Sequence, residues 1–177
     1  TEPTHKESFS EQLAYLPTYQ PNDDTLSFPE PVDRASVRLP MNGVVFACFC
    51  RSDKLDPVLF EVWMSILKQV PASVLWLYVT DPAGQVNLRS EARRWSVDPG
   101  RLIFASRLPK QAHIQRLTGA DLVLDTRLYN GHTTTSDALL AGVPVITIQG
   151  RHFASRVSAS LLKAQDLDTC ITYSLEE

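Results

Sequence analysis

The segment from Leu122 to Thr147, LVLDTRLYNGHTTTSDALLAGVPVIT, restricts the possible folds of this chain more than any other. It starts with a short apolar run, continues through a polar loop into a hydroxyl-rich stretch, and reaches a second apolar run after Pro144. The hydroxyl-rich stretch is expected to start a helix that stops at Gly142, because glycine often follows the last residue of a helix. Apolar runs on both sides of such a helix are typical of buried parallel strands. The segment therefore predicts a strand–helix–strand unit.

The loop that leaves the first of these strands carries Asn130, Gly131 and His132, and Thr133 and Thr134 follow at the expected helix start. The first N–H groups of a helix have no partner within it, and they lie at the positive end of its dipole. In an open α/β sheet such a helix start lies at the carboxyl ends of the strands, where phosphates bind. The loop therefore predicts a site for a phosphate-bearing ligand. The alternative is that a threonine only caps the helix, which stabilises it by about 1 kcal/mol without a ligand.

The rest of the chain after Gly43 also alternates between apolar runs and amphipathic segments. Asp56-Pro57 is a favourable helix start, because aspartate is a good N-cap and proline suits the first turn. We expect about five parallel strands with right-handed crossovers, so the fold class is α/β with a Rossmann-like, doubly wound parallel sheet. The other expected strands are Val44–Cys50, Ser73–Val79 and Leu102–Ala105, and further expected helices are Gln85–Trp95, Lys110–Leu117 and Ala154–Ala164.

Residues 1–40 differ from the rest of the chain in composition. Six of the twelve prolines lie here, among polar residues without helical or strand periodicity. Proline lacks an N–H donor and disfavours helix before it, so this part is expected to be a connector that runs over a surface. It is long for a loop within one domain, and the chain begins with Thr1, which suggests a fragment of a longer protein. We therefore expect a connector over residues 1–40 and one domain over residues 41–177.

Charge and composition exclude several classes of function. The formal net charge of −3 offers no general attraction for nucleic acid or for an anionic membrane surface. No apolar run approaches the roughly 20 residues of a membrane span, and the first residues do not resemble a secretory signal. The three cysteines are too few for a disulfide framework, and Cys48 and Cys50 are expected to be core residues rather than metal ligands. A cytoplasmic, reducing compartment fits this composition best.

Four more side chains are expected near the same crevice. Lys54 follows the first strand of the domain, where its ammonium can reach a diphosphate. His113 and Arg116 lie one helical turn apart after another strand. The imidazole can stack on a base or bind a phosphate, and Arg116 can bind a nucleobase or a phosphate. Asp137 lies one turn into the helix after the loop, where a carboxylate can accept ribose hydroxyls. The simpler alternatives are a solvated lysine, an amphipathic helix that faces water and a carboxylate stabilised by the helix dipole.

Several common sequence signatures are absent from the chain. It has no G-x-x-x-x-G-K-[ST], which excludes a P-loop, and no G-x-G-x-x-G dinucleotide fingerprint. Neither G-x-S-x-G nor H-E-x-x-H occurs, so a hydrolase elbow and a zincin site have no support. Asp121 and Asp125, which flank the strand before the loop, are expected to have structural roles.

Six segments, in order along the chain, together resemble one family. They are F-x-x-x-x-K-x-D-P at Phe49–Pro57, W-x-x-I-L-K-x-V-P-x-S-x-L-W-L at Trp63–Leu77, R-L-I-F at Arg101–Phe104, P-K-x-x-H at Pro109–His113, L-D-T-x-L-x-N-G-H-T-T at Leu124–Thr134 and A-S-R-V-x-A-S at Ala154–Ser160. These segments resemble the O-GlcNAc transferases with tetratricopeptide repeats, a family that includes the SPINDLY-type O-fucosyltransferases. The resemblance extends over about residues 40 to 165, and L-A-Y-L-P at Leu13–Pro17 is also similar.

The resemblance implies the C-terminal, nucleotide-binding lobe of a two-lobed GT-B glycosyltransferase. By similarity, Lys54 would be catalytic, and it would hold the donor diphosphate together with the turn at His132. The same similarity implies that His113 stacks on the base and that Asp137 binds the ribose. The implied donor-binding residues are Arg51, Lys54, Leu108, Pro109, Lys110, His113, Ile114, Gln115, Arg116, Asn130, Gly131, His132, Thr133, Thr134 and Asp137.

The implied reaction is an inverting transfer of GlcNAc from UDP-GlcNAc to a Ser or Thr hydroxyl of a protein. Negative charge builds on the leaving diphosphate, and Lys54 with the helix start would stabilise it without a metal or a resident cofactor. The implied partners are the nucleotide sugar, an N-terminal catalytic lobe and a protein acceptor held by tetratricopeptide repeats. Because this lobe and these repeats lie outside the chain, the chain alone is expected to bind a nucleotide without turnover.

Two departures from the family's usual residues concern the donor: Arg51 its affinity, and Tyr129 the identity of its sugar. Arg51 stands where relatives more often carry an amide, and it is expected to add a phosphate contact. Tyr129 replaces a smaller side chain that borders the N-acetyl pocket in the animal enzymes. The alternatives to a UDP-GlcNAc transferase are a GDP-fucose-dependent, SPINDLY-like transferase and a non-catalytic relative that binds a nucleotide or acts as a scaffold.

Overall fold

The computed structural model describes residue 7, residues 9–15 and residues 25–177. Its centre is a six-stranded sheet in which every neighbouring pair of strands is parallel. The strand order is β3-β2-β1-β4-β5-β6, the order of a Rossmann-like doubly wound sheet, which confirms the predicted fold class. The strands are β1 (Val45–Cys48), β2 (Val74–Leu77), β3 (Leu102–Phe104), β4 (Leu122–Leu124), β5 (Val145–Ile148) and β6 (Ile171–Thr172).

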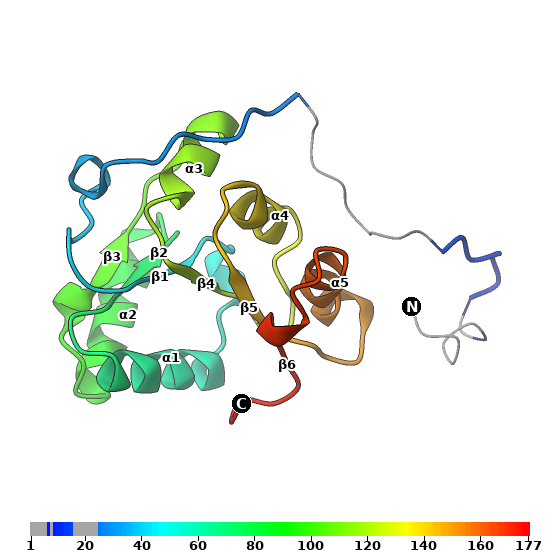
Figure 1. Ribbon diagram of the computed structural model, residues 1–177. Coiled ribbons are helices and arrows are strands. Elements are labelled where there is room, and N and C mark those ends of the chain that lie inside the picture. Colours follow the sequence, from blue (N-terminus) through cyan, green and yellow to red (C-terminus); the bar gives the residue numbers. More distant parts are fainter. Residues whose placement is uncertain (1–6, 8, 16–24) are drawn as a thin grey trace.

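Helices lie on both faces of the sheet (Figure 1). Alternate residues of a strand point to opposite faces, so Phe46 and Cys48 pack with one set of helices and Val45 and Ala47 with the other. Cys50 is buried on the same side as Cys48, which confirms that both are core residues. The first face carries α1 (Pro57–Gln69) and α2 (Pro82–Arg94), and the second carries α3 (Lys110–Leu117), α4 (Thr133–Leu140) and α5 (Val157–Lys163).

Aspartate–proline pairs mark the starts of the two helices on the first face. Asp56 caps α1 by accepting hydrogen bonds from two backbone N–H groups at 3.1 and 3.2 Å. Asp81 caps α2 in the same way with one bond of 2.7 Å. The expected start of the second helix at Gln85 is wrong, because the Asp81-Pro82 pair already begins it.

Two other expectations are wrong in detail. The helix expected from Ala154 to Ala164 is interrupted at Arg156, whose φ of −126° and ψ of −10° separate a 3-10 helix from α5. The sheet has six strands rather than about five, because β6 contains only two residues and leaves no periodic pattern in the sequence. Neither difference affects the loops at the carboxyl ends of β1 and β4.

Part of the expected connector packs on the domain. Arg34 donates a hydrogen bond to the carbonyl of Gly119 at 3.0 Å and pairs with Asp121 at 2.7 Å. Asp121 also accepts a bond from the Val45 N–H at 2.7 Å, which confirms its expected structural role. The boundary at residue 40 stays a prediction. Residues 1–6, 8 and 16–24, which include the end of the L-A-Y-L-P segment, lie outside the described residues.

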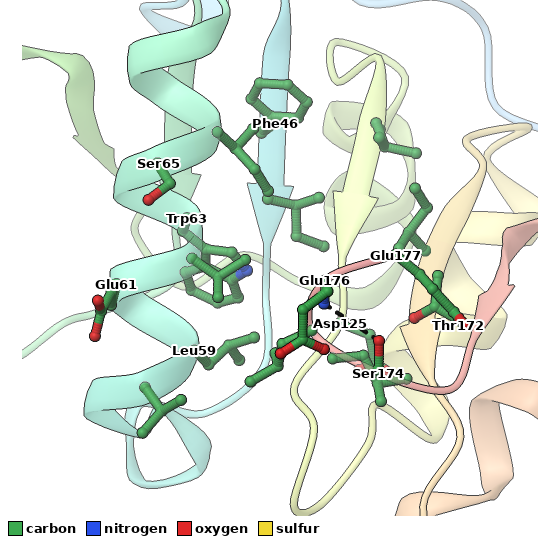
Figure 2. Close-up of a pocket in the computed structure, with 18 of the residues that line it drawn as sticks. Phe46, Leu59, Glu61, Trp63, Ser65, Asp125, Thr172, Ser174, Glu176 and Glu177 are labelled. Atoms are coloured by element: carbon green, nitrogen blue, oxygen red, sulfur yellow. Dashed lines mark hydrogen bonds between the residues drawn. The ribbon is translucent and has the colours of Figure 1, made fainter.

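The face that carries α1 is open beside that helix. A hollow of about 730 Å³ lies there, lined by apolar side chains of α1, β4 and β5 and by the last residues of the chain (Figure 2). Ile146 in β5 is consequently 37% exposed, although parallel sheets are usually covered on both faces. The hollow lies on the opposite face from the core packing of α4. No helix in the described ranges is long and apolar enough to cross a bilayer.

Candidate functional site

The strand order of the sheet reverses direction between β1 and β4, which are neighbours in the sheet. β1 pairs with β2 on one side and with β4 on the other. The chain leaves β1 toward α1 on one face and leaves β4 toward α4 on the opposite face. In open α/β sheets, ligands bind at such a switch point, outside the carboxyl ends of the strands. The loops that follow β1 and β4 therefore form the walls of the expected binding crevice.

The Asp125 carboxylate holds the loop after β4 in shape. Its Oδ1 accepts hydrogen bonds from the N–H groups of Thr126 at 2.8 Å and Gly131 at 2.6 Å, and its Oδ2 accepts one from the Thr147 hydroxyl at 2.7 Å. Burial raises the pKa of this carboxyl, and the hydrogen bonds that it accepts oppose the rise. The structural role expected for Asp125 is thus confirmed, and it includes fixing the backbone of Gly131 at the entrance to α4.

Helix α4 begins at Thr133, with His132 as its N-cap residue and without a side-chain capping bond. The alternative that Thr133 or Thr134 is an ordinary cap is therefore wrong, because both lie within the first turn. At Gly131 a Cβ would lie only 2.5 Å from Thr135 Oγ1 and 2.6 Å from Thr134 Oγ1. Glycine thus lets the loop pass close to the helix, and the first N–H groups of α4 lie at the crevice.

Lys54 ends a short 3-10 helix, Ser52–Lys54, just after β1. Its ammonium donates a hydrogen bond to the Asn130 carbonyl at 2.9 Å and lies 3.7 Å from the centre of the Tyr129 ring. The fully buried Asn130 side chain donates to the Thr126 carbonyl at 2.7 Å, so the loop that receives Lys54 is held by its own hydrogen bonds. The structure thus brings Lys54 to the turn before α4, although 76 residues separate Lys54 from Asn130.

Aromatic side chains surround His132 at this turn. The centre of its ring lies 5.2 Å from that of Tyr129 and 5.9 Å from that of Phe153. Burial, followed by the charge of Lys54, lowers the pKa of His132, so its imidazole is neutral at pH 7. Phe153 is exposed and was not expected at the site, because an isolated aromatic residue in a loop carries no pattern in the sequence.

A second group of side chains connects α3 with α4. Lys110, at the start of α3, forms an ion pair with the buried carboxylate of Asp137 in α4. The Nε2 atom of His113 lies 3.9 Å from the other oxygen of that carboxylate. Burial raises the pKa of Asp137, and the hydrogen bond and charge of Lys110 oppose the rise. A cation, an imidazole and a carboxylate are thus brought together from two helices.

His113 is also held from within its own helix. The Nε and Nη2 atoms of Arg116 lie 3.1 and 3.0 Å from the Nδ1 of His113, and the centre of the Phe49 ring lies 5.1 Å from that of the imidazole. Burial, followed by the charges of Arg116 and Lys110, lowers the pKa of His113 to about 4. Arg116 is only 5% exposed, so the alternative that His113 and Arg116 simply face water is wrong.

The other residues implied by the resemblance are spread around these two groups. Arg51 is exposed and pairs with Asp53 at 2.9 Å, whereas Ile114 is fully buried in the core. Three exposed residues lie at or near α3, namely Leu108, Pro109 and Gln115. The contact of each of these residues with a donor stays a prediction, as do the donor contacts of Lys54, His113 and the turn before α4.

Comparisons with known proteins agree on one family. The model described as Glycosyl transferase family 41 matches residues 31–177. The probable UDP-N-acetylglucosamine–peptide N-acetylglucosaminyltransferase SEC of Arabidopsis thaliana is 41% identical over 177 residues, which cover 96% of this chain and 18% of that protein. The UDP-N-acetylglucosamine–peptide N-acetylglucosaminyltransferase of Caenorhabditis elegans is 36% identical over 144 residues, which cover 81% of this chain and 12% of that protein.

A solved structure agrees with these sequence relatives. A mutant of the O-GlcNAc transferase of Thermobaculum terrenum superposes with a TM-score of 0.84 and 30% identity, over 99% of this chain and 33% of that one. The chain thus spans less than a fifth of the two sequence relatives and a third of the solved transferase. Because the family model covers most of the chain, the chain belongs to glycosyl transferase family 41.

Proposed function

We propose that the crevice between β1 and β4 binds the diphosphate of a nucleotide sugar, and that the chain is the donor-binding lobe of a protein O-glycosyltransferase. The observation that carries the proposal is the convergence of the Lys54 ammonium with the turn before α4, 2.9 Å from the Asn130 carbonyl. An ammonium group and the N–H groups of a helix start are both donors that suit phosphate oxygens. Their position at the switch point of the sheet supports a ligand there.

Lys54 has two partners that carry no charge in the ligand-free chain, the Asn130 carbonyl and the Tyr129 ring. A phosphate attracts an ammonium more strongly than a carbonyl or an aromatic ring does. The Lys54 ammonium is therefore expected to bind a diphosphate in the crevice in place of these two partners. Cleavage of the sugar–phosphate bond builds negative charge on the leaving diphosphate, and donors already in place stabilise that charge. The proposal therefore assigns Lys54 the catalytic role in an inverting, metal-independent transfer.

The nucleoside is proposed to lie beside α3 and α4. His113 is largely buried and neutral at pH 7, and it presents an aromatic ring that can stack on a base. Asp137 and Lys110, which pair with each other in the ligand-free chain, offer an acceptor and a donor for ribose hydroxyls. The diphosphate would then lie at the start of α4, and the ribose would lie one turn further along the helix, beside Asp137.

The donor and acceptor are proposed from the relatives. By their names, the Arabidopsis and Caenorhabditis proteins use UDP-N-acetylglucosamine and a peptide. We therefore propose UDP-GlcNAc as the donor and a protein Ser or Thr as the acceptor. The N-terminal lobe and the acceptor-binding repeats would come from parts of the protein outside this chain, in keeping with the small share of each relative that it covers. The chain alone is then expected to bind the donor without turnover.

Replacing His113 with alanine is expected to weaken uridine binding by about tenfold, since stacking of a base on an aromatic ring contributes about 1 to 3 kcal/mol. Calorimetric titration with uridine measures this change. Gln111→Ala is the matched control, because Gln111 is an exposed residue of the same helix and is not among the implied donor contacts. If His113→Ala and Gln111→Ala bind uridine equally well, His113 does not contact the base.

A further inference from the structure

Near the proposed base site, the side chain of Arg116 is held by several contacts. Its Nε and Nη2 atoms both point to Nδ1 of His113, at 3.1 and 3.0 Å. Its Nη1 donates to the Ser106 carbonyl, and its guanidinium lies 4.6 Å from the centre of the Phe49 ring. Three separate contacts therefore hold this guanidinium behind His113, and only 5% of the residue is exposed.

The contact with Arg116 determines where the proton of His113 lies. A guanidinium has only N–H donors and keeps its charge in proteins, so the nitrogen that it contacts must act as an acceptor. Nδ1 of His113 is then without a proton, and a neutral imidazole carries its proton on Nε2. Nε2 is the atom on the side of Asp137, 3.9 Å from its Oδ2. Arg116 and Asp137 thus favour the same tautomer from opposite sides of the ring.

The two cations next to His113 favour its neutral state, whereas the Asp137 carboxylate, which pairs with Lys110, favours the protonated form. Arg116 and Lys110 face the ring from α3, and Asp137 faces it from α4. Burial lowers the pKa of Arg116 to about 10, and Tyr78, which follows β2, opposes this change, so Arg116 is charged at pH 7. Burial and the two cations lower the pKa of His113 to about 4, so the imidazole is uncharged throughout the physiological range.

We propose that Arg116 is a positioning residue that holds His113 as the neutral Nε2–H tautomer, with its ring fixed against Phe49 so that one face is presented to a base. This inference rests on the proposed function, and it gives Arg116 an indirect role in place of the direct contact with a base or phosphate suggested by its position on the helix. A guanidinium is required because its planar fork reaches Nδ1 with two nitrogens while a third contacts Ser106. A lysine has one nitrogen and cannot make these contacts together.

The first test is the tautomer of His113 in the ligand-free chain, read from the ¹⁵N chemical shifts of its ring nitrogens. We expect Nδ1 to show the shift of an unprotonated acceptor and Nε2 that of an N–H group, unchanged between about pH 8 and pH 5.5, well above the pKa of about 4. A proton on Nδ1, or an average of the two tautomers, would overturn the role of Arg116. This measurement needs no variant and no ligand.

The second test compares Arg116→Lys with Arg107→Lys, where Arg107 is an exposed arginine just before α3. In Arg116→Lys we expect mixed tautomers of His113 and uridine binding that is weakened about fivefold, while the pKa of His113 stays low because its burial and the neighbouring positive charges are kept. Arg107→Lys should match the original chain. An unchanged tautomer and unchanged uridine affinity in Arg116→Lys would overturn the proposal.

The two tests separate this inference from the proposed function. The expected tautomer together with no binding of any nucleotide would contradict the proposed function and leave the contact between Arg116 and His113 established. Nucleotide binding together with an Nδ1-protonated ring would contradict the positioning role and leave the proposed function intact.

Discussion

Replacing Lys54 with alanine is expected to weaken UDP binding by about 30- to 100-fold and uridine binding by less than about twofold, because a hydrogen bond to a charged group contributes about 1.5 to 3 kcal/mol. In the ligand-free chain the ammonium already lies at the turn before α4, within 2.9 Å of the Asn130 carbonyl. Its loss therefore removes a positive charge from the proposed diphosphate site and leaves the nucleoside contacts of α3 in place. Calorimetric titrations with UDP and with uridine measure the two affinities.

Lys68→Ala is the matched control for Lys54. Lys68 is exposed in the last turn of α1, at the opposite edge of the sheet, and its replacement changes the net charge by the same amount. We expect both affinities of Lys68→Ala to equal those of the original chain. If Lys54→Ala weakens UDP and uridine by the same factor, Lys54 does not act on the phosphates.

The largest effect on stability is expected from Asp125→Ala. Its carboxylate accepts hydrogen bonds from two buried backbone N–H groups and from the Thr147 hydroxyl, and alanine would leave all three without this acceptor. Because each buried group left unsatisfied costs about 1 to 3 kcal/mol, the free energy of unfolding should fall by about 3 kcal/mol or more. Urea denaturation followed by circular dichroism measures this loss.

Asp125→Asn separates the hydrogen bonds of this residue from its charge. The amide oxygen can still accept from Gly131 and Thr126, while the amide nitrogen can donate to the Thr147 hydroxyl. We therefore expect a loss of less than about 1.5 kcal/mol, since most of the hydrogen bonds are kept. Equal losses for the two variants would show that the charge, rather than the hydrogen-bond acceptors, holds the loop after β4.

The fold was predictable because local signals in the sequence agree with one another. Continuous apolar runs at β1, β2 and β4 indicate strands covered on both faces, and the alternation with helices indicates parallel pairing. The start of α1 was predictable from Asp56-Pro57. The same signal at Asp81-Pro82, rather than Gln85, marks the start of α2. A two-residue strand such as β6 has too few residues to produce a periodic signal.

The sequence predicts which residues lie at the candidate site, but it does not predict which side chains contact one another there. The rule that strand ends meet at one edge of a sheet places Lys54 and the turn before α4 together. Sequence spacing also puts His113 and Arg116 on one side of α3. The partner of each side chain depends on distant parts of the chain, because Lys110 and Asp137 are 27 residues apart and Lys54 and Asn130 are 76 apart. Spacing along one helix contains no information about such pairs.

Burial explains why the function of Arg116 could not be read from its helix alone. An arginine on a helix face is usually solvated, and nothing in the residues around it indicates that Phe49 and the Ser106 carbonyl enclose it. Phe49 comes from the first strand end and reaches Arg116 only when β1 and α3 are placed in the same fold. Arg116 is therefore buried by tertiary packing, although its place on the helix alone suggests a surface residue.

The most direct test of the proposed function is a calorimetric titration of the chain with UDP, with GDP as the competing ligand. The predicted result is a one-to-one complex with UDP and weaker binding of GDP. If Lys54→Ala also removes most of the affinity for UDP, the crevice between β1 and β4 is the donor site. Preference for GDP would contradict UDP-GlcNAc as the donor and favour the fucosyl alternative. No heat with either nucleotide would contradict the central claim that this chain binds the nucleotide of a sugar donor.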